Sequence, residues 1–167
     1  LRNSSAASDV YKRQGFALAK EAAKRGANVS LISGPVDLDT PENVHRTNVS
    51  SATEMKKEIE NKFDDIDVLI MSAAVADYQP VVSYKRKIKK SDDNMVIELK
   101  KTPDILKDLA KKKKKQIVIG FALETESEIK NAYKKMKNKN LDAIVLNSLK
   151  DKGAGFGYNT NKVTIIT

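Results

Sequence analysis

The chain of 167 residues is predicted to form an α/β domain with an open, mainly parallel sheet and helices on both faces. Two observations support this fold class. Helix-forming stretches alternate with short apolar runs along the chain, as they do in βαβ units. No internal repeat or low-complexity linker divides the sequence, and its length suits about one domain. The predicted elements are helices over 15–25, 51–63 and 102–111, a helix beginning after 125, and strands over 28–32, 68–71, 95–99, 116–122, 141–146 and 162–166.

Local signals justify the elements of the first half. The first helix consists of strong helix formers (GFALAKEAAKR), and Gly26 follows where a left-handed C-cap is expected. An apolar alternation (NVSLI) then predicts a strand. Ser51 and Glu54 form a capping box that begins the next helix. The apolar block after Asp67 (VLIM) predicts a fully buried strand.

The second half begins with an alternating run (MVIEL, 95–99) that predicts a half-exposed strand. Thr102, Pro103 and Asp104 supply an N-cap, a first-turn proline and a first-turn acid for the helix that follows. The run QIVIGFA predicts another buried strand, and Thr125 is expected to cap the last helix. One stripe of that helix is predicted to be buried, namely Ile129, Ala132, Tyr133 and Met136.

Small or polar residues follow three of the predicted strands, which indicates one shared crevice. In such sheets ligands bind outside the carboxyl ends of the strands. Ser72 to Asp77 end one strand, Gly120 to Ala122 a second, and Asn147 follows a third. Other interpretations stay open at this point. The alanines suit a tight strand-to-helix crossing, Asp77 a helix cap, and Phe121 a place in the core.

The net charge of +9 predicts attraction to polyanions without choosing among them. The densest basic run, 111–115, is also what a solvated helix end contains. Aromatic residues make up only 5%, and none alternate with basic residues, so nucleic acid is not the expected partner. No apolar segment is long enough for a membrane span, and the absence of cysteine fits a cytoplasmic location.

Two classes of site are not expected from the motifs. His45, the only histidine, is predicted to lie at the surface, and with no cysteine a transition-metal site is not expected. Neither G-x-G-x-x-G nor G-x-x-x-x-G-K-[ST] occurs, so lysines and helix N-termini would have to hold any bound phosphate.

From Gly15 onward, the chain resembles phosphopantothenoylcysteine synthetase, also called phosphopantothenate–cysteine ligase. The blocks that carry the resemblance are GFALAKEAAKRGANVSLISGPV, SAAVADYQP, KIKK, KKTPDIL, VIGFALETE, KNLDAIVLN and the FG…N.VT ending. They cover about nine tenths of the chain. The resemblance implies a Rossmann-like fold, a homodimer, and in bacteria a frequent fusion behind a flavin-dependent phosphopantothenoylcysteine decarboxylase.

The resemblance also implies an activity, the ligation of 4′-phosphopantothenate to cysteine through an acyl-cytidylate in coenzyme A biosynthesis. CTP would be the co-substrate, Mg²⁺ would accompany it, and FMN would belong only to a fused decarboxylase. Two alternatives remain. One is an NAD(P)-dependent oxidoreductase of similar fold, and the other is a basic, non-catalytic nucleotide-binding module.

The resemblance assigns roles to individual positions. Lys87 would be catalytic, Ala74 and Ala76 would bind substrate, and the metal ligands are left unassigned. A mobile flap is predicted over 79–94, around Lys87. Nucleotide binding would fall to Met71, Ser72, Ala73, Asp77, Lys87, Pro103, Asp104, Ile105, Leu106, Phe121, Lys135 and Lys139.

The resemblance fails at the N-terminus. Residues 1–14 do not match the family's N-H-S-S-G-K-M-G motif, and Ser8 stands where its functional asparagine would be. The expected organisation is therefore an unmatched leader over 1–14, followed by a synthetase domain over 15–167 that is truncated at both ends and of doubtful activity alone.

Overall fold

The computed structural model describes residues 6–82, 95–148 and 162–167. Its helices are α1 (Ala6–Lys24), α2 (Ala52–Glu60), the 3₁₀ turn η1 (Phe63–Asp65), α3 (Ile105–Lys112) and α4 (Glu128–Asn138). Its strands are β1 (Val29–Ser33), β2 (Val44–Asn48), β3 (Val68–Met71), β4 (Tyr78–Pro80), β5 (Leu99–Lys101), β6 (Ile117–Glu124), β7 (Ala143–Ser148) and β8 (Val163–Ile166). Lys87 lies outside these ranges, as does most of the flap predicted over 79–94. No contact of Lys87 is therefore described.

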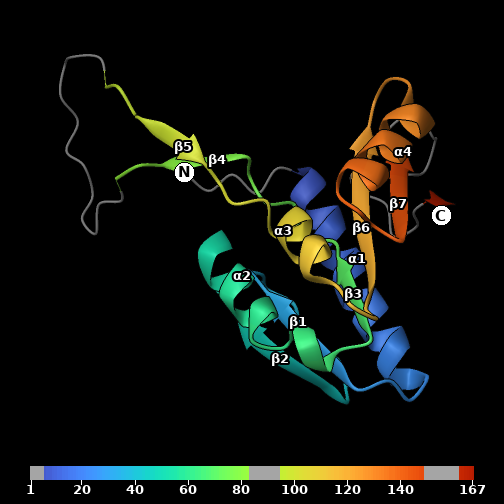
Figure 1. The fold of residues 1–167 in the computed structure, drawn as a ribbon. Coiled ribbons are helices and arrows are strands. Elements are labelled where there is room, and N and C mark those ends of the chain that lie inside the picture. The colour runs from blue at the N-terminus through green and yellow to red at the C-terminus, as the bar shows by residue number, and fades with distance from the viewer. Residues whose placement is uncertain (1–5, 83–94, 149–161) are drawn as a thin grey trace.

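The strands form an α/β arrangement that confirms the predicted Rossmann-like fold class. β3, β6, β7 and β8 make one sheet in that order, and only β8 is antiparallel to its neighbour. β1 and β2 pair in parallel as a second sheet. Figure 1 shows α1 passing behind β3 and β6, with α4 in front of β6 and β7. Helices thus cover both faces of a mainly parallel sheet.

The core lies between β6, β7 and the helices that cover them. Leu109, Val118, Ala132 and Ile144 each have 0% of their surface exposed. At Gly120 an added Cβ would lie 2.8 Å from a Leu141 methyl carbon, so only glycine lets these layers pack so closely. The core therefore fixes β6 and α4, which carry several of the predicted site residues.

The helix signals of the first half are confirmed. Ser51 Oγ accepts a hydrogen bond from the Glu54 N–H at 3.1 Å, and Glu54 Oε2 accepts one from the Ser50 N–H at 2.8 Å. In the usual capping box the Glu side chain accepts a hydrogen bond from the N–H of the N-cap residue, which here is Ser51. In this protein Glu54 accepts from the preceding residue, Ser50. Gly26 has φ +88°, as expected of a left-handed C-cap. α1 begins at Ala6, earlier than the predicted helix.

Both helix caps expected in the second half are wrong. Asp104, and not Thr102, caps α3, because its carboxylate accepts the Lys107 N–H at 3.1 Å. α4 begins after Ser127, whose φ of 45° lies in the left-handed region and whose side chain caps nothing. Thr125 therefore lies outside the helix, and the sequence pattern placed its start too early.

Burial departs from the pattern in α4, β3 and the run before β5. Ala132 and Met136 are buried in α4, but Ile129 and Tyr133 are 64% and 48% exposed. Only half of the predicted stripe is therefore buried. β3 is covered on one face only. Residues 95–98 form no strand, because regular pairing begins only at Leu99.

β4 and β5 form a two-stranded antiparallel ribbon of their own. Figure 1 shows it extending away from the two parallel sheets. Asp77 leads directly into this ribbon, where its carbonyl accepts the Thr102 N–H at 2.8 Å. The interpretations of Asp77 as a helix cap and of the alanines as a crossing into a helix are therefore wrong.

Candidate functional site

A cavity of about 440 Å³ opens where β1 and β3 end. The segment after β3 forms one wall, Ser33 and Gly34 after β1 form another, and α1 and the start of α2 complete the lining. Small side chains dominate the wall after β3, because Ser72 is followed by two alanines. The cavity thus lies at the carboxyl ends of parallel strands, the position expected for a ligand in this architecture.

Gly15 leaves room for the Ser72 side chain where α1 meets the end of β3. A Cβ built on this residue would lie 2.7 Å from Ser72 Oγ, too short for an ordinary contact. The next residue, Phe16, is only 8% exposed and lines the same cavity. Its ring carries the Arg46 guanidinium 5.0 Å from the ring centre. One face of the aromatic ring is therefore covered by the protein itself.

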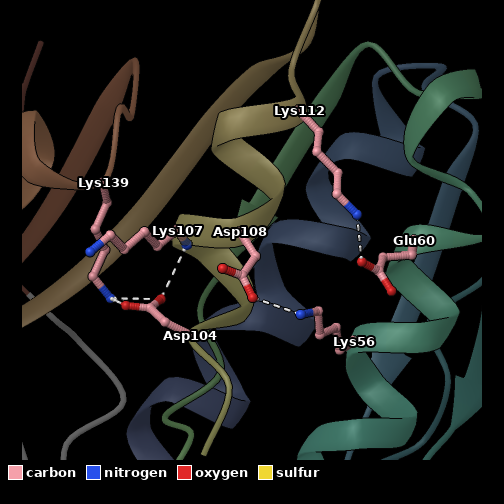
Figure 2. A network of polar contacts seen from close by, with 7 residues as sticks. All are labelled: Lys56, Glu60, Asp104, Lys107, Asp108, Lys112 and Lys139. Atoms are coloured by element: carbon pink, nitrogen blue, oxygen red, sulfur yellow. Dashed lines mark hydrogen bonds and ion pairs between the residues drawn. The ribbon is translucent and has the colours of Figure 1, made fainter.

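A group of charged side chains lies at the N-terminus of α3. Figure 2 shows Lys139, the C-cap residue of α4, directed at the Asp104 carboxylate, with an Nζ–Oδ2 distance of 2.8 Å. The same carboxylate caps α3 through Lys107 N–H. One turn earlier in α4, Lys135 Nζ donates to the Phe121 carbonyl at 3.2 Å. Two lysines of α4 therefore face the end of β6 and the start of α3.

Burial and neighbouring charge shift the pKa of both Lys135 and Asp104. Burial lowers the pKa of Lys135, and the nearby positive charge of Lys139 lowers it further. Glu124, Asp104 and Asp77 oppose this lowering only in part. Burial acts to raise the pKa of Asp104, but hydrogen bonds from Lys139 and from the Lys107 N–H outweigh it and hold the pKa below its ordinary value. Lys135 therefore has incomplete charge compensation, and a bound anion would be attracted to it.

Two further ion pairs hold α3 against α2. Lys56 Nζ lies 2.6 Å from Asp108 Oδ2, and Lys112 Nζ lies 3.0 Å from Glu60 Oε1, as Figure 2 also shows. Hydrogen bonding to Asp108 raises the pKa of Lys56 above its ordinary value. These pairs link two helices that lie far apart in the sequence, so they help to fix the position of the Asp104 end of α3.

The basic run 111–115 forms ion pairs with acidic residues of the chain itself. Lys113, Lys114 and Lys115 reach Asp142, Asp64 and Asp67 at 2.8, 3.2 and 3.8 Å. Asp142 also accepts the Val118 N–H at 2.7 Å, which ties the run to β6. This run therefore contributes to the fold, and the lysines of α4 are the better candidates for binding an anion.

The predicted site residues divide into groups in the structure. Ser72, Ala73, Ala74 and Ala76 line the cavity. Asp104, Phe121, Lys135 and Lys139 form the charged group. Asp77 connects the two groups, since its neighbours Ala76 and Tyr78 line the cavity while its charge acts on Lys135. Met71 packs against the core, and Ile105 and Leu106 are 2% and 7% exposed. Pro103 lies beside Thr102, which lines the cavity.

Two walls of the cavity, those from α1 and β1, were not predicted from the sequence. Gly15, Phe16 and Ser33 line it, although no pattern marked them as site residues. The available signal was the SGP triplet after the strand, which has the same small residues at a strand end as SAA after β3. Asn147, at the third strand end, is 4% exposed and accepts a hydrogen bond from Gln14 Nε2 at 3.2 Å.

The residues that the structure describes contain no group of three or more histidine, cysteine, aspartate or glutamate side chains that could hold a metal ion. Within the same ranges, no helix is long and apolar enough to cross a membrane.

The fold and the cavity define an α/β domain with a ligand site at its strand ends. Residues 5–167 match the family described as the DNA/pantothenate metabolism flavoprotein C-terminal domain, and the chain belongs to this family. It is 49% identical over 154 residues to the coenzyme A biosynthesis bifunctional protein CoaBC of Bacillus subtilis. It is 51% identical over 156 residues to a protein from an unknown prokaryotic organism named cysteine/cysteine sulfinic acid decarboxylase.

Two solved structures resemble the chain. The crystal structure of the C-terminal domain of a CoaBC protein has a TM-score of 0.76 and 38% identity, covering 92% of this chain and 67% of that one. A DNA/pantothenate metabolism flavoprotein from Streptococcus pneumoniae has a TM-score of 0.71 at 23% identity, covering 93% of this chain and 80% of that one, which supports the fold alone. The two curated relatives are longer proteins, since 92% of this chain covers only 38% and 44% of their lengths.

These findings correct the activity expected from the sequence. The family is described as a flavoprotein domain, and the relative with 51% identity is named a decarboxylase. They contradict the expected phosphopantothenate–cysteine ligase, together with CTP and Mg²⁺ as its main cofactors. The physical reason is that lysines and small strand-end residues can hold many phosphate-bearing ligands, so the motifs identify the domain better than the reaction.

Proposed function

We propose that this chain is the substrate-binding domain of a flavin-dependent decarboxylase that acts on 4′-phosphopantothenoylcysteine in coenzyme A biosynthesis. The bifunctional CoaBC relatives and the relative named as a decarboxylase support the pathway and the reaction. A fused or associated flavin-binding domain and a homodimer are part of this proposal. The domain boundary at Gly15 also stays a prediction.

The observation that carries the proposal is the positive charge near Asp77, whose neighbours Ala76 and Tyr78 line the cavity. Lys135 and Lys139 extend from one face of α4 toward the strand ends, and the lowered pKa of Lys135 reflects incomplete compensation of its charge. The cavity has a volume of about 440 Å³, and many of the side chains that line it are small. This combination suits a flexible, mainly apolar chain that ends in a phosphate group.

Each group has a definite role in this proposal. Lys135 and Lys139 hold the substrate phosphate, and Asp104 keeps Lys139 in place through its 2.8 Å ion pair. The segment from Ser72 to Ala76 lets the substrate chain approach the backbone. These contacts bind and orient the substrate, so their loss should raise KM more than it lowers kcat.

The described residues do not fit a flavin as well as they fit such a substrate. Phe16 and Tyr78 are the aromatic residues that line the cavity, and the Arg46 guanidinium already covers one face of Phe16. A planar three-ring system is held best between free aromatic or apolar faces. When bound, FMN would supply the electron transfer, and we assign its site to the remainder of a longer protein like the relatives.

The binding step is tested with the chain itself. Titration calorimetry with 4′-phosphopantothenoylcysteine, and with the same compound lacking its phosphate, is expected to show at least tenfold tighter binding of the phosphorylated form. Lys135→Met combined with Lys139→Met should remove that preference. Lys130→Met, at an exposed position of the same helix, is the matched control. Binding of CTP with Mg²⁺, together with no binding of phosphopantothenoylcysteine, would contradict the proposal.

The reaction is tested as CO₂ release by the full-length, FMN-containing protein. The double lysine variant is expected to raise KM about tenfold with kcat little changed, since the lysines bind a part of the substrate that does not react. Absence of CO₂ release in the unsubstituted, FMN-loaded protein would rule the decarboxylase out.

A further inference from the structure

β1 and β3 each have a strand neighbour on one edge only, within the residues that the structure describes. β1 pairs with β2, and β3 pairs with β6, in both cases in parallel. The cavity is lined by residues of β1 and by residues that follow β3, but by none of β2 or β6. β1 and β3 are therefore the inner strands of the two sheets, and we call their free edges the inner edges. Unpaired edges of this kind can accept a further strand.

Backbone groups of alternate residues point outward along the inner edges. The Ser33 carbonyl accepts the Val49 N–H at 2.9 Å, so the odd-numbered residues of β1 face β2. The Asp67 carbonyl accepts the Ile117 N–H at 2.9 Å, so the odd-numbered residues of β3 face β6. Because these groups recur every second residue on both strands, one added strand can bond to both inner edges at once. The backbone groups left for it are those of Ser30, Ile32, Val68 and Ile70.

Apolar side chains beside the inner edge of β3 are poorly covered. Val68 and Ile70 are 45% and 42% exposed, although the run VLIM is typical of a strand buried on both faces. Ile117, the register partner of Val68 on β6, lies on the same face and is 49% exposed. Neighbouring strands lie about 4.8 Å apart, so the side chains of an added strand would contact Val68 and Ile70 directly. This exposed patch is what an empty neighbouring position would leave.

The order of the strands points to the same position. In the doubly wound α/β sheet, the first strand lies at the centre, between the second and the fourth. β2 and β1 occupy the positions of the third and second strands, and β3, β6 and β7 occupy those of the fourth to the sixth. The central position, between β1 and β3, is the one that no described strand occupies.

We propose that the inner edges of β1 and β3 bind an extended apolar segment of another polypeptide as a parallel strand. The bound strand joins the two sheets into one, and its carboxyl end meets the cavity. Four or five residues match the lengths of β3 and β1. Since both faces of a central strand are covered, the segment carries valine or isoleucine at successive positions and no proline. This site rests on the backbone of two strands, and it is independent of the substrate proposed above.

A fluorescent synthetic peptide tests the binding of such a strand. Its core alternates valine and isoleucine (VIVIV) to match the length of β1, and glutamates flank the core for solubility. In fluorescence anisotropy this peptide is expected to bind the unsubstituted chain at least tenfold more tightly than a matched peptide with a central proline (VIPIV). The reason is that proline cannot donate a hydrogen bond to a strand edge. Equal binding of the two peptides, or no binding at about 0.1 mM, would overturn the proposal.

A disulfide trap locates the bound strand and its direction. The chain has no cysteine, so one introduced thiol reports on its own contacts. Val68→Cys, at the start of β3, is expected to crosslink to a peptide with cysteine at the amino end of its core and not to one with cysteine at the carboxyl end. The matched control is Val163→Cys on β8, the opposite edge of the same sheet, which should crosslink to neither peptide. No crosslink at Val68→Cys, equal crosslinking of both peptides there, or preferential crosslinking at Val163→Cys would overturn the site.

Discussion

Lys135 shows how one residue can serve binding at a cost to stability. Its ammonium group is partly buried, it donates to the Phe121 carbonyl at 3.2 Å, and Lys139 lies nearby. Burial and like charge lower its pKa, so the protonated side chain destabilises the folded state when no anion is bound. The i, i+4 spacing of Lys135 and Lys139 predicts that both lie on one face of a helix. It gave no sign of this burial, which depends on how α4 packs against β6.

Because the charged Lys135 side chain destabilises the folded state, the folding stability is predicted to depend on pH. Its folded pKa lies below the model value of 10.5, so at neutral pH both folded and unfolded states are protonated and the penalty is complete. As the pH rises through the folded pKa toward 10.5, the folded state releases its proton first and the penalty fades. Lys135→Met should therefore be more stable than the unsubstituted chain at pH 7, by a margin that shrinks toward pH 10.

Urea denaturation across this pH range measures the margin. Lys130→Met serves as the matched control, because its side chain is exposed on the same helix. A constant difference between the Lys135→Met protein and the unsubstituted chain from pH 7 to pH 10 would show that Lys135 carries no such penalty.

The start of α3 is the element on which the charged group depends. Asp104 caps the helix through the Lys107 N–H and also pairs with Lys139. Asp104→Ala removes both contacts and is expected to cost about 1 kcal/mol of folding free energy. Asp104→Asn keeps the cap and loses the charge, so it should cost less, since partly exposed ion pairs contribute about 0–1 kcal/mol.

The sign of the pH effect at Asp104 is opposite to that at Lys135. Its folded pKa lies below the model value of 3.8, so its contribution is complete above that value and is lost as the pH falls through the folded pKa. Urea denaturation at pH 7 and pH 3 should therefore show a smaller loss for Asp104→Ala at the lower pH. Equal stability of the Asp104→Ala protein and the unsubstituted chain at pH 7 would contradict both roles.

The helix starts also show how far the sequence predicts the elements. The box at Ser51 and Glu54 is confirmed because both partners lie within one turn. The start at Thr125 is wrong because β6 continues to Glu124 and the chain then turns through Ser127 with a positive φ. The residues at three strand ends predict a shared crevice. Those after β3 line the cavity, and Phe121 of β6 belongs to the charged group. The walls from α1 and β1 depend on long-range packing, such as Gly15 against Ser72, which no local pattern encodes.

At the scale of the whole molecule, the cavity lies between two separate sheets, and hydrogen exchange can test whether one ligand contacts both. The cavity joins two sheets, since Ser33 follows β1 and Ser72 follows β3. Saturating 4′-phosphopantothenoylcysteine should slow exchange on both walls, around 33–34 and 72–76, because one ligand contacts both. Exchange that slows on one wall only, at saturating ligand, would contradict a single ligand that contacts both sheets.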